Sequence, residues 1–111
     1  MRKYGNHEVK IDGYTFASKA EARRYQQLSL LEKAGAIKCL RLQPEYELIP
    51  KFKKGGKTYR KTVYIADFEY IEDGRKIVED VKGFATDVYK LKKKLFEYKY
   101  PELTIKEVKK K

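Results

Sequence analysis

Residues 62–83 read TVYIADFEYIEDGRKIVEDVKG, and this stretch decides the fold. Its first part, residues 62–71, is rich in β-branched and aromatic side chains, which favour a strand. Asp73-Gly74 is a hairpin signal, and residues 76–82 again have the character of a strand. The stretch therefore predicts two neighbouring antiparallel strands joined by a tight turn.

The segments before this stretch predict a hairpin, a helix and a further strand. Residues 1–17 are expected to form the hairpin, and residues 18–34 the helix, which Ser18 caps and Gly35 ends. Alternating side chains then indicate an extended segment, which continues the meander over residues 37–82. Within it, Pro44 suggests a bulge or an edge position, and Lys54-Gly55-Gly56-Lys57 indicates a hairpin tip.

After Gly83 the sequence predicts a second helix over residues 86–99 and a last strand over residues 103–108. The apolar stripe of this helix is expected to consist of Val88, Leu91, Leu95 and Tyr98. The order helix, three-strand meander, helix, strand predicts one α/β (α+β) domain over residues 1–111. Its mixed central sheet is a three-strand antiparallel meander plus a further strand, flanked by two helices.

The chain is strongly basic, with 27 Lys and Arg against 16 Asp and Glu and a net charge of +11. Such an excess suggests a polyanionic partner, and nucleic acid is the first candidate. The single cysteine, Cys39, excludes an internal disulfide, and we expect no zinc cluster and no small-molecule cofactor. No apolar run is long enough for a membrane span, and the N-terminus is too polar for a secretory signal, so a cytoplasmic protein is expected.

Two carboxylates and a lysine are the candidate chemical groups. Asp67 lies in the most strand-like stretch, where its neighbours on the same face are expected to be apolar. On the next strand, Asp80 and Lys82 are two residues apart and therefore project from the same face. Carboxylate oxygens are the ligands that Mg²⁺ prefers, and a lysine beside the metal can orient an attacking water or stabilise developing charge.

Simpler interpretations stay open at this point. Asp80 and Lys82 could be an exposed ion pair that contributes about 0–1 kcal/mol. Glu21 follows Ser18 by three residues, which is the spacing of a capping box, so it is either a site residue or a helix cap.

The pattern of acidic and basic residues resembles the PD-(D/E)XK nuclease superfamily. It is more closely similar to a small phage-encoded, resolvase-like branch catalogued as a domain of unknown function. The stretches that carry the resemblance are residues 16–22, 42–44, 64–68, 78–83 and 86–92. The resemblance implies the restriction-endonuclease-like αβββαβ core. Two departures are Ala66, where the classical motif has Pro, and Asp80, where many members have Glu.

The resemblance also implies a role for each matching residue. Glu21, Asp67, Asp80 and the carbonyl of Val81 would ligate Mg²⁺, for which Mn²⁺ would substitute. Lys82 would lie by the attacking water, and Gln43 matches a glutamine often found near such sites. We therefore expect a metal-dependent endodeoxyribonuclease of phage recombination or DNA processing.

Cleavage of branched DNA, including Holliday junctions, is one form of this activity, and its paired cuts would require a homodimer. Nine basic residues are candidate phosphate contacts: Lys19, Arg23, Arg24, Lys54, Lys57, Arg60, Lys90, Lys93 and Lys94. The alternatives are a non-catalytic nucleic-acid-binding protein and a protein-interaction module such as a phage inhibitor of a host enzyme. The sequence also leaves RNA open as a substrate.

Overall fold

The computed structural model describes residues 8–109 and has an α+β fold. Its helices are α1 (Lys19–Lys33) and α2 (Asp87–Lys99). Its strands are β1 (Val9–Ile11), β2 (Tyr14–Phe16), β3 (Lys38–Leu42), β4 (Glu45–Ile49), β5 (Phe52–Lys54), β6 (Lys57–Tyr59), β7 (Thr62–Ile65), β8 (Phe68–Glu72), β9 (Arg75–Lys82) and β10 (Ile105–Lys109).

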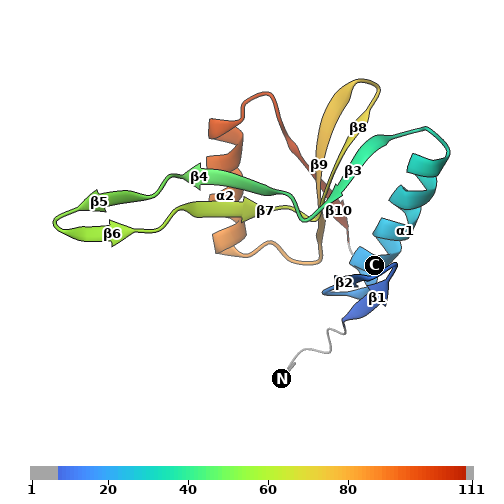
Figure 1. Ribbon diagram of the computed structural model, residues 1–111, viewed down its shortest axis with the longest axis horizontal. Helices are drawn as coiled ribbons and strands as arrows, with labels where there is room; N and C mark the ends of the chain where they lie inside the picture. Colours follow the sequence, from blue (N-terminus) through green and yellow to red (C-terminus); the bar gives the residue numbers. More distant parts are fainter. Residues whose placement is uncertain (1–7, 110–111) are drawn as a thin grey trace.

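The central sheet has four strands in the order β10-β9-β8-β3. Neighbouring strands are antiparallel from β3 to β8 and from β8 to β9, whereas β10 runs parallel to β9. The parallel pair is possible because α2 provides the crossover between β9 and β10. Helices α1 and α2 lie on opposite sides of this sheet (Figure 1).

Alternating side chains of β9 divide the interior into two cores, one on each face of the sheet. Val78 packs with Tyr89 and Phe96 on the α2 side. Val81 packs with Leu28 and the neighbouring aromatic residues on the α1 side. Asp80 therefore shares the α2 face, which is the feature of the fold that positions the candidate site.

Helix α1 begins as the sequence predicts. The Ser18 hydroxyl accepts a hydrogen bond from the backbone N–H of Glu21 at 3.2 Å. Tyr25 and Leu28 are buried against the sheet, and the Glu32 carboxylate accepts from the backbone N–H of Leu40 at 2.9 Å. The face that Glu21 shares with these residues is therefore the face that packs on the sheet.

The apolar stripe expected for α2 is wrong in three of its four members. Val88, Leu91 and Tyr98 are exposed, and only Leu95 packs partly against the core. The buried residues of the helix are Tyr89 and Phe96, which are seven residues apart. This aromatic pair fits a cluster of tyrosines on β4 and β7, and packing against that cluster sets the rotation of the helix.

The sheet is more fragmented than expected, because two predicted strands break. The strand expected over residues 62–71 ends at Ile65 and resumes at Phe68, so Asp67 lies in a strand break and not beside Val63 and Ile65 on one strand face. The extended segment around Pro44 breaks between β3 and β4, where Gln43 has a φ of +52°. Pro has no N–H for a ladder, and a positive φ turns the chain away from the sheet.

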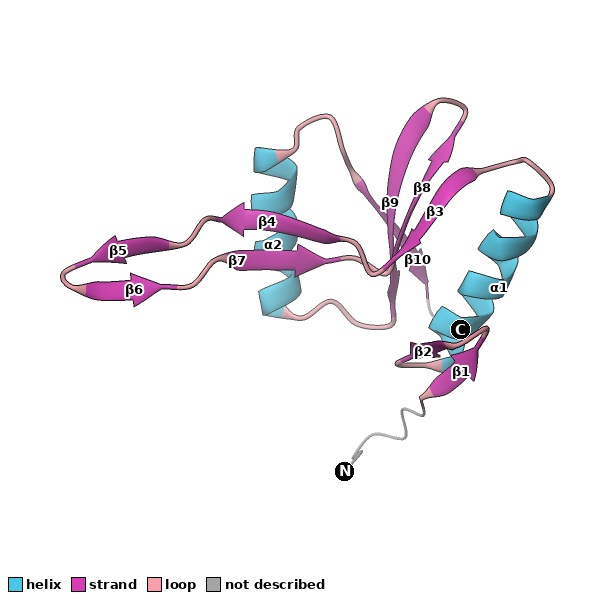
Figure 2. Ribbon diagram, in the orientation of Figure 1, coloured by secondary structure: helices cyan, strands magenta, loops and turns pink. Residues whose placement is uncertain are grey.

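Between these breaks, residues 45–65 leave the sheet as a long arm. Strand β4 pairs with β7 and β5 pairs with β6, both antiparallel, and each pair forms a two-stranded ladder of its own. The arm projects away from the sheet, and its tip is Gly55-Gly56 (Figure 2). Both glycines have positive φ, as a tight hairpin turn requires.

The N-terminal hairpin predicted for residues 1–17 is present as β1 paired with β2, and residues 1–7 of that prediction lie outside the described residues. Within residues 8–109, neither helix is long and apolar enough to cross a membrane.

Candidate active site

Asp67 is held by backbone contacts on both sides of its strand break. Its N–H donates to the carbonyl of Glu79 at 3.1 Å, and its own carbonyl accepts from the N–H of Gln43 at 2.9 Å. Its carboxylate Oδ2 accepts from the N–H of Val81 at 2.7 Å. The Asp67 side chain thus takes the place of a backbone carbonyl as the hydrogen-bond acceptor for β9. This contact fixes the carboxylate beside the end of that strand.

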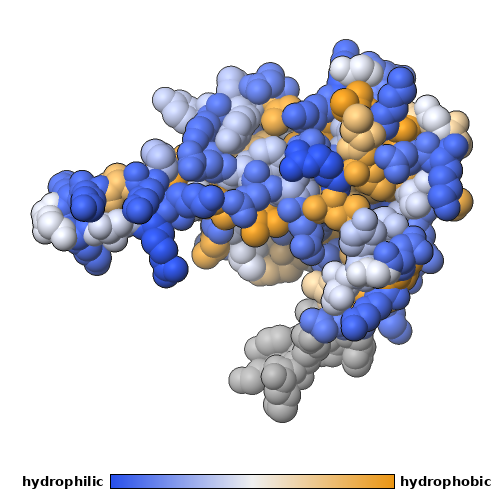
Figure 3. Space-filling view, viewed as in Figure 1, coloured by the Kyte–Doolittle hydropathy of each residue, from blue (hydrophilic) through white to orange (hydrophobic). Residues whose placement is uncertain are grey.

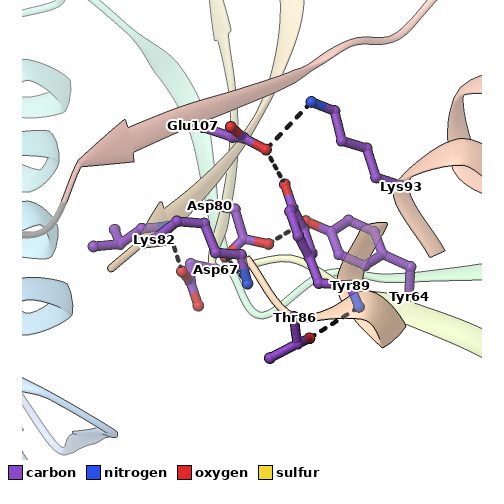
Figure 4. Close-up of polar contacts among 9 residues, drawn as sticks. Tyr64, Asp67, Asp80, Lys82, Thr86, Tyr89, Lys93 and Glu107 are labelled. Atoms are coloured by element: carbon purple, nitrogen blue, oxygen red, sulfur yellow. Dashed lines mark hydrogen bonds and ion pairs between the residues drawn. The ribbon is translucent and has the colours of Figure 1, made fainter. Parts of the chain in front are cut away.

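Asp80 is a buried carboxylate with two polar partners on the same face of the sheet. The Tyr64 hydroxyl donates to its Oδ2, and the Lys82 ammonium lies 3.3 Å from its Oδ1. Figure 4 shows Asp67, Asp80 and Lys82 close together beside Tyr64 and Tyr89. The two carboxylates and the lysine that the sequence singles out are therefore neighbours.

The two carboxylates perturb each other. Burial, and then the adjacent Asp80 carboxyl group, raises the pKa of Asp67 to about 8, against the opposing effect of the Val81 N–H. Glu21 also raises this pKa through its charge, so it lies within electrostatic reach of Asp67. Two carboxyl groups thus lie beside Lys82 at a place where holding both charged is unfavourable, and a bound divalent cation would offset their repulsion.

Glu21 lies at the edge of the group formed by Asp67, Asp80 and Lys82. It lies on the sheet-facing side of α1, and its backbone N–H takes part in the helix cap. Within residues 8–109, no three acidic, histidine or cysteine side chains come close enough together to form a metal-binding cluster. The structure therefore brings Asp67, Asp80 and Lys82 together and places Glu21 beside them without completing a three-carboxylate cluster.

Lys82 is positioned by Tyr89, which the sequence did not single out as a site residue. Its Nζ lies 3.9 Å from the centroid of the Tyr89 ring, a cation–π contact. The Tyr89 hydroxyl donates to Glu107 at 2.7 Å, and Lys93 lies 3.2 Å from the same oxygen. The pKa of Glu107 lies below its usual range, mainly because of the hydrogen bond from the Tyr89 hydroxyl and also because of Lys93. Glu107 pairs with Asp80 in the β9–β10 register, so this chain of contacts borders the site.

The sequence carried one signal for these tyrosines. The chain has 10 Tyr and no Trp, and a buried tyrosine needs a partner for its hydroxyl. Tyr64 and Tyr89 satisfy their hydroxyls on acidic residues beside the site, and burial followed by those carboxylates raises the pKa of each phenol.

An open hollow of about 270 Å³ leads to the site from the α2 side. Its lining residues are Val63, Tyr64, Ile65, Asp80, Lys82, Thr86, Val88, Tyr89 and Lys92. The lining residues come from β7, from the end of β9 and from the start of α2. Asp80 and Lys82 therefore border a hollow that is open to solvent.

Glu79 lies on the opposite face of β9, as strand periodicity predicts. It is fully buried and accepts two hydrogen bonds from Arg24, at 2.6 and 3.0 Å, and one from the Tyr70 hydroxyl at 2.5 Å. This ion pair ties α1 to the sheet. The guanidinium of Arg24, expected to contact DNA, is thus already engaged.

The chain belongs to a described family. The model for "protein of unknown function (DUF1064)" matches residues 1–111. The chain is a member of this family. No curated protein matches the chain, and neither does any solved structure.

The basic residues expected to contact phosphates lie on three elements. Lys19 and Arg23 are exposed on α1, and Lys90 and Lys94 are exposed on α2, whereas Lys93 is half-buried beside Glu107. Lys54, Lys57 and Arg60 are exposed on the arm. Figure 3 shows the outer part of the arm as mostly hydrophilic, interrupted by small apolar patches, on the face in view.

Proposed function

We propose that this protein is a metal-dependent endonuclease that hydrolyses DNA phosphodiester bonds, of the PD-(D/E)XK type. One observation carries the proposal. Asp67, Asp80 and Lys82 come from a strand break and from the end of β9, yet they converge on one face of the sheet. A buried and a half-buried carboxyl group beside a lysine, next to a hollow open to solvent, are groups that metal-assisted hydrolysis uses.

The topology supports the same proposal. Without the arm and the N-terminal hairpin, the element order is α1-β3-β8-β9-α2-β10. Three antiparallel strands are followed by a helix and by a strand parallel to the third. This order agrees with the αβββαβ core that the resemblance implies, and the arm is an insertion between its first two strands.

The donor set fits a hard divalent cation such as Mg²⁺ or Mn²⁺, which prefers carboxylate, carbonyl and water oxygens. Asp67 and Asp80 would hold it, with the carbonyl of Val81 and with Glu21 as further ligands. The bound metal would supply a water of lowered pKa and neutralise charge on the scissile phosphate.

The chain's own residues have distinct roles in this proposal. Tyr64 fixes one oxygen of Asp80 by donating to it, which leaves the other oxygen toward Lys82. Lys82 would orient the attacking water or stabilise the charge that develops on the phosphate, because Tyr89 holds its ammonium beside the site. Gln43 adjoins Asp67 through its backbone, and its side chain would approach the substrate.

The biological setting is part of the proposal and rests on the resemblance: a phage-encoded enzyme in the host cytoplasm that processes recombining or branched DNA. Paired cuts in a Holliday junction require two copies of the site. The exposed apolar residues Leu91 and Tyr98, one helical heptad apart on α2, provide a face for a second copy.

The test is cleavage of linear, nicked and four-way DNA with Mg²⁺ or Mn²⁺. The wild type should cut at least one of these DNAs, and Asp80→Asn and Lys82→Ala should lose at least about a hundredfold in rate, a change typical of removing a group that stabilises the transition state. Asp73→Asn and Lys106→Ala are matched controls, because both change the charge of an exposed residue outside the site. Equal cutting by wild type and Asp80→Asn would remove Asp80 from the mechanism.

A non-catalytic nucleic-acid-binding protein is the second candidate, and the basic arm and helices favour it. The same assays separate the two. A non-catalytic binder should bind DNA at low salt and cut none of the DNAs with either metal. Its affinity for DNA should be unchanged in Asp80→Asn.

A further inference from the structure

The arm carries a dense and unbalanced charge. Residues 51–61 read KFKKGGKTYRK, with six Lys or Arg and no acidic residue. Every one of these eleven residues is exposed. The charge on this segment therefore faces solvent and is complementary to a polyanion.

One face of the arm combines this charge with an exposed aromatic pair. Phe52 pairs with Tyr59 in the β5–β6 register, and Lys54 pairs with Lys57 on the same face two residues closer to the tip. The two rings are stacked, with centroids 4.8 Å apart and an interplanar angle of 10°. The ammonium of Lys57 lies 5.0 Å from the centroid of the Tyr59 ring.

Cross-strand packing leaves much of the ring surface of this pair exposed. Stacked aromatic residues stabilise a two-stranded ladder, and Phe52 and Tyr59 do so here. However, they remain 44% and 39% exposed. Apolar ring surface beside the positive charges of Lys54 and Lys57 suits a ligand that has both phosphates and aromatic faces, which is a nucleic-acid strand with unstacked bases.

We propose that this face of the arm, formed by Phe52, Tyr59, Lys54 and Lys57, binds unpaired nucleotides of a DNA strand next to the cleavage site. The lysines contact phosphates and the rings stack on bases. The link between this surface and cleavage rests on the proposed function. The inference identifies the substrate class as DNA with a single-stranded segment.

The length of the arm sets where that segment lies. Tyr59 is five residues from Tyr64, which contacts Asp80. At about 3.3 Å per residue in a strand, the aromatic pair lies roughly 17 Å from the site. That distance corresponds to about five steps of duplex DNA at 3.4 Å per step, so the unpaired nucleotides would lie within about five positions of the cut. Flaps, overhangs and branch points have unpaired bases within that range.

The experiment measures DNA binding by fluorescence anisotropy in EDTA, so that no cleavage is involved. The probes are a 20-base-pair duplex and the same duplex with a ten-nucleotide thymidine overhang. The wild type should bind the overhang DNA roughly tenfold more tightly than the duplex, since base stacking on one aromatic side chain contributes a factor of this order. The double variant Phe52→Val/Tyr59→Val should lose this preference and keep its affinity for the duplex.

A charge variant and a conservative variant are the matched controls. Lys54→Gln/Lys57→Gln should weaken binding to both DNAs and lower the slope of log affinity against log salt by about 1 to 2. Phe52→Tyr keeps the stack and should behave as the wild type. Valine retains strand propensity, and the circular dichroism of each variant checks that the fold is intact.

Crosslinking of the wild type tests the same contact without any substitution. An overhang that carries 5-bromodeoxyuridine should crosslink on irradiation to a peptide containing Phe52 or Tyr59. The proposal is overturned by crosslinks only outside the arm, by equal affinity of the wild type for both DNAs, or by an aromatic variant that weakens both equally. Because binding is measured without metal, a failure of the wild type to cut DNA would count against the proposed function and leave this result standing.

Discussion

The carboxylate of Asp67 accepts a hydrogen bond from the backbone N–H of Val81 at 2.7 Å. This contact joins the break between β7 and β8 to the end of β9, one residue after Asp80 and one before Lys82. It holds the Asp67 carboxylate at the point where the arm leaves the sheet, next to Asp80 and Lys82.

Asp67→Asn should stabilise the metal-free protein at pH 8. The folded pKa of about 8 lies above the ordinary value of 3.8, so the folded state holds a proton that the unfolded state releases between these pH values. Stability of the wild type should therefore fall as pH rises from about 4 to 8. Asparagine removes this linkage, so the variant should have the higher free energy of unfolding in urea at pH 8.

Repeating the urea series from pH 4 to 8 provides the check. The variant should show a flatter dependence of the free energy of unfolding on pH than the wild type. Asp87→Asn, at an exposed position in the first turn of α2, is the control. Parallel pH curves for wild type and Asp67→Asn would show that the Asp67 carboxyl is not protonated in the folded protein.

Mg²⁺ should raise the melting temperature of the wild type, because a ligand that binds only the folded state stabilises it by mass action. At a concentration 100 times its dissociation constant the gain is about 2.7 kcal/mol. Asp80→Asn removes one proposed ligand and should abolish the shift. Asp73→Asn, in the β8–β9 turn at a φ of +51° that Asn tolerates, should retain it. A shift shared by all three proteins would point to metal bound elsewhere.

Arg24→Ala should destabilise the fold by about 3 kcal/mol or more, because it leaves Glu79 charged and fully buried without its ion-pair partner. Arg23→Ala is the matched control, since Arg23 is exposed one position earlier on α1. Chemical unfolding of both variants measures the difference. Similar stability of the two would mean that the Arg24–Glu79 pair is not formed in solution.

Tyr89 should act on cleavage through Lys82, as a positioning residue. Tyr89→Leu removes the ring under the ammonium and should lower kcat several-fold to tenfold, in keeping with the energy of a cation–π contact. Tyr89→Phe keeps the ring and loses only the hydrogen bond to Glu107, so its kcat should stay close to that of the wild type. A change in KM alone, with kcat unchanged in Tyr89→Leu, would argue against this role.

Local patterns in the sequence were sufficient to predict much of this architecture. Ser18 and Gly35 delimit the first helix because capping depends on side chains near in sequence. The turns at Asp12-Gly13 and Asp73-Gly74 have positive φ at both residues, as their sequences require. The placement of Asp80 and Lys82 on one face follows from the period of a strand.

Local patterns could not predict the rotation of α2 or the strand breaks at Gln43 and Asp67. Lysines surround both possible apolar stripes of α2, so the period of 3.6 residues does not select between them. The choice of Tyr89 and Phe96 comes from tyrosines on the arm, which are distant in sequence. Each strand break is likewise stabilised by contacts to a second segment, between Gln43 and Asp67 and between Ala66 and Pro44.

The sequence by itself determined the helices, the hairpin turns, the excess of positive charge and the pairing of Asp80 with Lys82. These depend on propensity, on capping and on periods of a few residues. Only the tertiary structure decided that Asp67 lies in a strand break against Val81, that Tyr64 and Tyr89 border the site, and that residues 45–65 project as an arm. These depend on hydrogen bonds and packing between segments far apart in the chain, which no local pattern encodes.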